Sequence, residues 1–195
     1  EHESGLHVLP GPVSAERPDE HTLFLILEQL RHSYDFVVVD ASTPGEDELP
    51  KEVELADSIL LTMQLSLPCL ARVTRLIDSI GGQDPDADRR MRLVATRVSR
   101  NGSIGVSDAA EVLGREITWS IPEDGETALS SINQGTPLVR AYPKSPSAKA
   151  VQALVKDLAP KVRKPRKGLS LPFSSFFRKK GKSSDSNDNL AGATL

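Results

Sequence analysis

Five short apolar runs are spaced along the chain, and each of them predicts a β-strand. In the middle three runs the apolar residues stand at consecutive positions and do not alternate with polar ones. Such runs are typical of strands that are buried on both faces of a parallel sheet. The predicted strands are Leu6–Leu9, Phe36–Val39, Ser58–Met63, Met91–Thr96 and Ile117–Ile121.

The segments between these runs repeat their apolar residues at the spacing of an amphipathic helix. We expect the helix that starts at Pro68 to stop at Gly81-Gly82. The next helix should be capped by Ser107 or Asp108 and ended by Gly114. Because alternating strands and helices need crossover connections, the order predicts an α/β fold with a three-layer, mostly parallel sheet. The predicted helices are His21–His32, Pro68–Ile80, Ser107–Leu113, Thr127–Asn133 and Ser147–Leu158.

The charge of the 195-residue chain, formally −3, is unevenly distributed. Residues 1–160 carry 15 basic and 25 acidic side chains, whereas residues 161–195 carry 9 basic and 2 acidic ones. From position 161 the composition also shifts to Lys, Arg, Ser, Pro and Gly. This predicts a folded domain over 1–160 and a basic tail over 161–195 that is disordered in isolation. The acidic body argues against a globular surface that binds nucleic acid.

Composition excludes several classes of protein. The longest apolar runs are five or six residues, which is too short for a membrane-spanning helix. The single cysteine, Cys69, excludes a disulfide framework and a multi-thiolate zinc site, and it fits a reducing cytoplasmic setting. The chain starts at Glu1 and not at an initiator methionine, so the N-terminus reads like a cut inside a longer protein.

The residues after the predicted strands are the candidates for chemistry, because open parallel sheets bind ligands beyond the carboxyl ends of their strands. Asp40 ends the Phe36–Val39 run and offers a carboxylate of the kind that holds hydrated Mg²⁺ beside a nucleotide. Capping of the next turn is the alternative role for this residue. Arg97 follows the fourth strand and Pro122–Asp124 follows the fifth, so both are expected at the same sheet edge as Asp40.

Several segments resemble, in order, the motifs of the MinD/ParA group of P-loop ATPases. Tyr34–Asp40 resembles the Walker B strand of that group, and Gly5–Pro10 resembles the strand before it. The other matches are Leu93–Arg97 to the strand-Asn/Thr-Arg motif, Ile121–Asp124 with Asn133–Pro137 to the IPxD…NxGxP signature, and Pro146–Leu158 to the closing helix. The resemblance covers residues 5–158 and implies the P-loop NTPase fold with a deviant Walker A motif.

The resemblance implies a site for ATP and Mg²⁺ in the full-length protein. Asp40 would hold the water shell of Mg²⁺ and so be an indirect metal ligand. The implied cofactor-binding residues are Pro44 and Gly45 in a switch that senses the γ-phosphate, and Thr96, Arg97, Pro122, Glu123 and Asp124 around the adenine. The switch is two residues longer than the Asp-x-Pro of the group, which argues against tight coupling to hydrolysis.

The glycine-rich loop that cradles phosphates is not found in the sequence. The only Gly-Lys-Ser string, Gly181–Ser183, lies in the tail with no strand before it, and Phe176 stands where the first loop glycine belongs. The resemblance therefore implies the C-terminal portion of an ATPase domain without its first strands. As it stands, such a chain would neither hydrolyse ATP nor bind it tightly, and its incomplete sheet would leave an unpaired strand edge.

Within the group, the closest resemblance is to the CpaE/TadZ branch, which localises and helps to assemble Flp/tight-adherence pili. It rests on Thr62–Pro68 followed by Arg72 and Arg75-Leu76. This implies a nucleotide-dependent homodimer that meets pilus or secretion-machinery proteins at the inner face of the membrane. A MinD-type septum-positioning ATPase is the first alternative. A degenerate, non-hydrolysing scaffold of the same fold is the second.

The basic tail contains a short amphipathic pattern. Phe173, Phe176 and Phe177 share one helical face, and Arg178, Lys179 and Lys180 follow directly. Apolar rings next to cations are typical of segments that dock on an anionic membrane surface or on a partner. A solvated polybasic tail and a contact with nucleic acid are the alternatives. The tail thus predicts a cytoplasmic protein that associates peripherally with the plasma membrane.

Overall fold

The computed structural model describes residues 4–11, 18–41 and 50–159. By its contacts the chain divides into two units, Glu1–Leu158 and Ala159–Leu195. The fold described below is that of the first unit.

The sheet has three parallel strands in the order β1 (Ile59–Gln64), β2 (Met91–Val98) and β3 (Ile117–Pro122). β1 and β2 pair without interruption from Ile59 opposite Met91 to Gln64 opposite Thr96. Three of the five predicted strands are therefore confirmed. Because the strands run in one direction, their carboxyl ends meet at one edge of the sheet.

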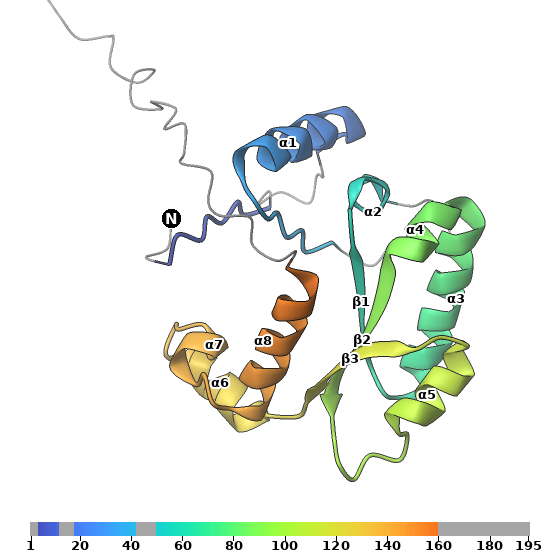
Figure 1. The fold of residues 1–195 in the computed structure, drawn as a ribbon, viewed down its shortest axis with the longest axis vertical. Helices are drawn as coiled ribbons and strands as arrows, with labels where there is room; N and C mark the ends of the chain where they lie inside the picture. Colours follow the sequence, from blue (N-terminus) through green and yellow to red (C-terminus); the bar gives the residue numbers. More distant parts are fainter. Residues whose placement is uncertain (1–3, 12–17, 42–49, 160–195) are drawn as a thin grey trace, which may run out of the picture. The chain divides into compact units, whose positions relative to one another are not determined.

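Helices cover both faces of this sheet, which confirms the predicted three layers. In Figure 1, α3 and α5 lie on one side of the strands and α8 lies on the other. The contacts agree, since α3 touches β1, α5 touches β3 and α8 touches the opposite face of β3. The helices are α1 (Glu20–Ser33), α2 (Lys51–Leu55), α3 (Leu67–Gln83), α4 (Pro85–Arg90), α5 (Val106–Leu113), α6 (Gly125–Asn133), α7 (Leu138–Ala141) and α8 (Pro146–Leu158).

The core lies mainly between the sheet and α3 and α5. Leu93 and Ala95 of β2 pack there with Leu70 and Val73 of α3, and all four side chains are buried. Val94 points to the opposite face and is buried as well, so β2 is covered on both faces as its unbroken apolar run predicts. In β1, burial alternates along the strand instead. The second layer therefore covers the middle of the sheet and not the face of β1.

The predicted end of α5 at Gly114 is confirmed, whereas its predicted cap at Ser107 or Asp108 is wrong, since Gly105 is the N-cap. The predicted end of α3 is wrong as well. Gly114 ends α5 in the left-handed conformation with φ 61°. At the start of α5, the carboxylate of Asp108 accepts a hydrogen bond of 3.0 Å from the N–H of Gly105. α3 continues through Gly81-Gly82 to Gln83. The buried Ile80 anchors this last turn, and its carbonyl accepts the N–H of Asp84 at 2.8 Å.

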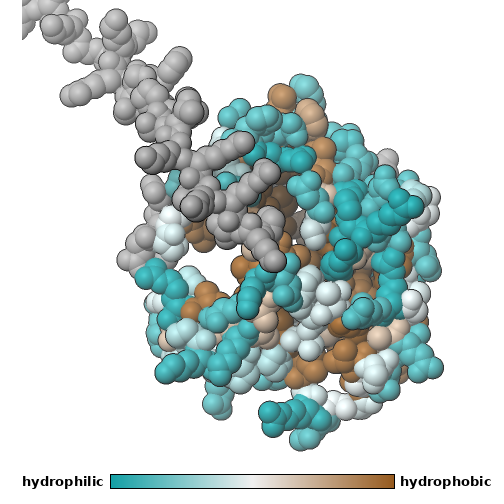
Figure 2. Space-filling view, viewed as in Figure 1, coloured by the Kyte–Doolittle hydropathy of each residue, from teal (hydrophilic) through white to brown (hydrophobic). Residues whose placement is uncertain are grey.

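The first two predicted strands, Leu6–Leu9 and Phe36–Val39, are not formed. Residues 6–11 and 36–41 belong to no helix or strand, and apolar side chains such as Phe36 (62% exposed) and Val38 (94%) face solvent. A parallel strand needs a hydrogen-bonded neighbour, and within the described ranges β1 pairs only with β2. Figure 2 shows apolar surface interrupting the polar surface on the face in view.

A side-chain contact, and not a backbone ladder, joins the first of these segments to Tyr34, the residue that follows α1. The hydroxyl of Tyr34 and Nδ1 of His7 are 2.6 Å apart, and the two rings meet edge to face with centroids 5.3 Å apart.

None of the helices in the described ranges has the length and apolar character that a membrane crossing requires.

Candidate functional site

The carboxyl end of β2 is distorted at Arg97. The pairing of β2 with β3 breaks between Ala95 and Val98, and Arg97 adopts φ 52°. Among the residues that the structure describes, Arg97 is the one non-glycine residue with positive φ. Such a conformation costs about 1 kcal/mol and is concentrated at binding sites. The bulge leaves the Arg97 side chain exposed at the sheet edge where ligands of parallel sheets bind.

Thr96 stabilises the strand just before this bulge. Its hydroxyl donates a hydrogen bond of 3.0 Å to the carbonyl of Met63, at the end of β1. Thr96 is half-buried, so the strained position beside it is held between two strands that keep their pairing. The hydroxyl of Thr96 therefore fixes the sheet edge, while the residue itself borders the site.

The loop after β3 lies against the same bulge. The N–H of Glu123 donates to the carbonyl of Val98 at 3.0 Å, and Val98 pairs with Pro122. Glu123 is exposed, Pro122 is half-buried, and α6 starts directly after Asp124. The structure thus brings together five of the predicted site residues, and it places them at the ends of two neighbouring strands: Thr96, Arg97, Pro122, Glu123 and Asp124.

Asp124 is turned into the protein at the point where β3, α6 and α8 meet. Its Oδ2 atom is buried and has no hydrogen-bond partner among the described residues. The hydroxyl of Thr127, followed by the N–H of Ser147 and the hydroxyl of Ser145, holds the pKa of the Asp124 carboxyl below its usual range. These donors therefore favour the ionised form of the Asp124 carboxyl.

We predict that Asp124 makes the fold sensitive to acid. Because its pKa is lower in the folded chain, its stabilising effect is full above the unfolded value of about 3.9 and disappears as pH falls through the folded value. Asp124→Asn should therefore flatten the loss of unfolding free energy below about pH 4. Urea unfolding followed between neutral and acid pH measures this slope. An unchanged slope in the variant would contradict the assignment.

The other predicted site residues are not brought to this edge. Asp40 is exposed and stands in the segment that forms no strand, so the predicted presentation of its carboxylate from a strand end is not seen. Pro44 and Gly45 lie outside the described residues, as do the predicted docking residues of the tail, Phe173, Phe176, Phe177, Arg178, Lys179 and Lys180. Within the described ranges, no three His, Cys, Asp or Glu residues are grouped as metal ligands.

Three polar residues that the sequence analysis did not single out support the site. Thr127 of α6 and Ser145 and Ser147 at the start of α8 surround the Asp124 carboxylate. The hydroxyl of Ser145 caps α8 by accepting the N–H of Ala148 at 3.1 Å. The Ser-Pro-Ser string predicts a helix start, but nothing in it indicates contact with a loop more than twenty positions earlier.

The chemistry of these residues suits a ligand that is anionic or π-rich and that carries a hydrogen-bond donor. An exposed arginine, a proline ring and an exposed carboxylate stand together at the carboxyl edge of a parallel sheet. A guanidinium binds anionic or π-rich groups, and a carboxylate accepts hydrogen bonds from an exocyclic amino group.

Comparison with known proteins gives the same fold. No family model matches the chain. An uncharacterized ATP-binding protein of Methanocaldococcus jannaschii is 24% identical over 162 residues, which are 81% of this chain and 60% of that protein. A ParA family ATPase of Chlorobium tepidum superposes with a TM-score of 0.67 at 22% identity, covering 77% of this chain and 63% of that one. MinD of Aquifex aeolicus gives 0.60 at 22% identity, covering 74% and 64%.

The fold is that of the MinD/ParA-type P-loop ATPases, which confirms the resemblance at the level of this group. The chain spans about 60% of the length of the relatives it matches. One matched structure, a septum site-determining MinD of Pyrococcus horikoshii, is complexed with Mg-ADP and superposes with a TM-score of 0.55 at 20% identity, covering 71% of this chain and 56% of that one.

Proposed function

We propose that this protein is a nucleotide-dependent positioning and assembly factor of the CpaE/TadZ type, with ATP and Mg²⁺ as its ligands. The observation that carries the proposal is the strained, exposed Arg97 beside the Pro122–Glu123 loop. Residues in sparsely populated backbone conformations cluster at active sites, ligand clamps and switch regions. The matched ATP-binding protein and the Mg-ADP complex of a MinD support a nucleotide as that ligand.

Each residue of the edge has a role that its chemistry allows. The Arg97 guanidinium would bind the nucleotide, the Pro122 ring would border the base, and the Glu123 carboxylate would accept a hydrogen bond from its amino group. When bound, Mg-ATP supplies the γ-phosphate whose presence distinguishes the two states of a switch. Asp40 would hold the hydrated metal, and Pro44 and Gly45 would form the switch itself.

The assignment to pilus assembly rests on the segment that joins β1 to α3. This segment carries the CpaE-like Thr62–Pro68 string. Leu67, the first residue of α3, is 73% exposed at the same edge of the sheet as Arg97. An exposed leucine beside a nucleotide site is suited to contact a partner whose binding depends on which nucleotide is bound. We propose a pilus or secretion-machinery protein as this partner and a homodimer as the active form.

A MinD-type septum-positioning ATPase is the second candidate. It is favoured by the matched MinD structures, one of which is a MinC:MinD complex of Aquifex aeolicus with a TM-score of 0.59 at 23% identity, covering 74% of this chain and 62% of that one. Both candidates place a cytoplasmic protein at the inner face of the membrane. In both, the Phe173–Phe177 and Arg178–Lys180 segments would provide the docking, and two copies in a dimer would bind better than one.

Titration of ATP into the protein expressed from its complete reading frame tests the proposal. We expect Mg²⁺-dependent binding by calorimetry and a dimer by light scattering. Asp40→Asn should lower the Mg²⁺-dependent affinity about tenfold or more, because the metal loses a charged acceptor in its water shell. Asp35→Asn changes an exposed carboxylate five positions earlier and should leave binding unaltered.

The possible results separate the nucleotide switch from the non-hydrolysing scaffold. Binding that is equal with and without Mg²⁺, or equal in Asp40→Asn and the wild type, would remove the proposed role of Asp40. No ATP binding at all would overturn the nucleotide switch and leave the non-hydrolysing scaffold.

A further inference from the structure

Ser147 makes a hydrogen bond that links the last helix, α8, to the base-side loop (Pro122–Glu123). Its hydroxyl donates to the carbonyl of Pro122 at 3.0 Å, and the residue is 6% exposed. A buried serine inside a helix commonly returns its hydroxyl to a carbonyl of the preceding turn, whereas Ser147 is the second residue of α8 and has no such turn before it. Ser131 of α6 makes this local bond, with its hydroxyl 2.9 Å from the carbonyl of Ala128. The Ser147 contact is therefore tertiary, between residues 25 positions apart.

Asp124 adds a second link between the same two elements. It follows Pro122 by two positions, and its Oδ2 atom is out of contact with solvent. Donors reach its carboxylate from Thr127 on α6, from Ser145 just before α8 and from the N–H of Ser147 on α8. These donors favour the ionised carboxylate, and they tie it to both helices. Asp124 thus faces the protein interior, whereas its neighbour Glu123 is exposed.

The position of Glu123 depends on both links. Its N–H is hydrogen-bonded to Val98, directly after the bulge at Arg97. On the other side, the Pro122 carbonyl is held by Ser147, and the Asp124 carbonyl accepts the N–H of Ala128 in α6. The exposed Glu123 therefore lies between Pro122 and Asp124, and hydrogen bonds to α8 and α6 fix the main chain of both.

We infer that Ser147 and Asp124 are positioning residues, through which the amino end of α8 fixes the main chain of the base-side loop from Pro122 to Glu123. They act through the loop and do not touch the nucleotide. The inference rests on the proposed function, because only that function assigns this loop to a nucleotide base. Its structural content, that α8 holds this loop, can be measured with or without a nucleotide.

Amide hydrogen exchange of the wild type, Ser147→Ala and Ser131→Ala tests the structural content. Ser131→Ala is the matched control, since it removes a buried hydroxyl whose bond stays within one helix. Loss of the Ser147 contact leaves the Pro122 carbonyl unpaired, so we expect the Glu123 amide to exchange about tenfold faster in Ser147→Ala only. Ser147→Thr keeps the hydroxyl and should restore the slow exchange. Asp124→Asn provides a second test if Ser147→Ala does not fold.

Nucleotide titration then tests the consequence for the site. In Ser147→Ala we expect the affinity for ATP to fall about tenfold and that for inorganic tripolyphosphate, which has no base, to stay unchanged. Equal Glu123 exchange in Ser147→Ala and Ser131→Ala would overturn the inference whatever the nucleotide result. Equal losses for ATP and tripolyphosphate would also overturn it. Faster exchange in a protein whose wild type binds no ATP would instead contradict the proposed function alone.

Discussion

Arg90→Met is expected to lower the free energy of unfolding by about 2–3 kcal/mol, which corresponds to a fall in Tm of about 8 °C for a chain of this size. Methionine keeps most of the aliphatic volume of arginine, so the loss measures the guanidinium and not a cavity. Thermal and urea unfolding followed by circular dichroism would show it.

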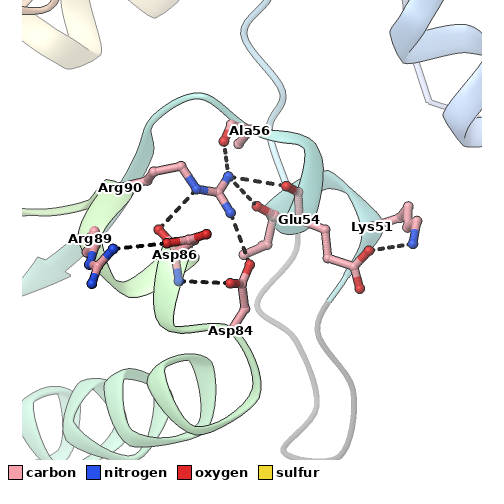
Figure 3. A network of polar contacts seen from close by, with 8 residues as sticks. Lys51, Glu54, Ala56, Asp84, Asp86, Arg89 and Arg90 are labelled. Carbon is pink, nitrogen blue, oxygen red and sulfur yellow. Dashed lines mark hydrogen bonds and ion pairs between the residues drawn. The ribbon is translucent and has the colours of Figure 1, made fainter.

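The reason is the number of groups that this one guanidinium satisfies. Nη1 donates to the carbonyls of Val53, Glu54 and Ala56 at the end of α2, with distances of 3.3 Å to Val53 and 3.2 Å to Glu54. Nη2 binds the Asp84 carboxylate at 3.1 Å (Figure 3). The Arg90 side chain is only 24% exposed, so water cannot replace it fully. Without it, the last carbonyls of α2 lose their donors.

The neighbouring Arg89 provides the matched control. Its ion pair with Asp86 is at the surface, with side-chain exposures of 81% and 80%. Arg89→Met should therefore cost no more than about 0.5 kcal/mol. Equal losses in the two variants would show that the contacts to α2 contribute nothing, and the account of Arg90 would be wrong.

Arg97→Asn is expected to lower the affinity for ATP by about tenfold to a hundredfold, since a hydrogen bond from a charged group contributes about 1.5–3 kcal/mol. Asparagine accepts the left-handed backbone that Arg97 adopts, so the fold should keep its stability within about 0.5 kcal/mol. Calorimetric titration and thermal unfolding of the same sample give both quantities.

Arg100→Asn is the control for this variant. Arg100 is also exposed and lies three positions later, so the two substitutions change the net charge equally. An equal loss of affinity in both variants would mean that Arg97 acts through long-range charge and not as a contact. A loss of stability in Arg97→Asn alone would mean that the arginine is retained for the fold.

The long elements of the fold follow from the sequence because their signal is a repeat. The spacing of apolar residues in α1, α3, α5, α6 and α8, and the unbroken run in β2, each predict the observed element. The short helices α2, α4 and α7 have four to six residues, too few for a repeat to appear. The Leu6–Leu9 and Phe36–Val39 runs carry a strand pattern, but pairing depends on a neighbouring strand and not on the run itself.

The candidate site, like the fold, is predicted by the sequence only in part. Its location follows from the rule that ligands bind at the carboxyl ends of parallel strands, which places Arg97 and Pro122–Asp124 together. The bulge at Arg97 is accompanied by a backbone hydrogen bond from Glu123 to Val98, and the inward turn of Asp124 depends on donors of Ser145 and Ser147, more than twenty positions later. Both features depend on residues far apart in the sequence, so no local pattern of side chains predicts them.

The single tryptophan gives the chain an internal optical reporter. Trp119 lies on β3, and its indole N–H donates to the carboxylate of Asp157, near the end of α8, at 3.1 Å. The ring is half-buried under that helix. Detachment of α8 would break this bond and bring water to the indole, and its emission would shift to longer wavelength. Fluorescence therefore reads the docking of the last helix directly, in a protein that needs no label.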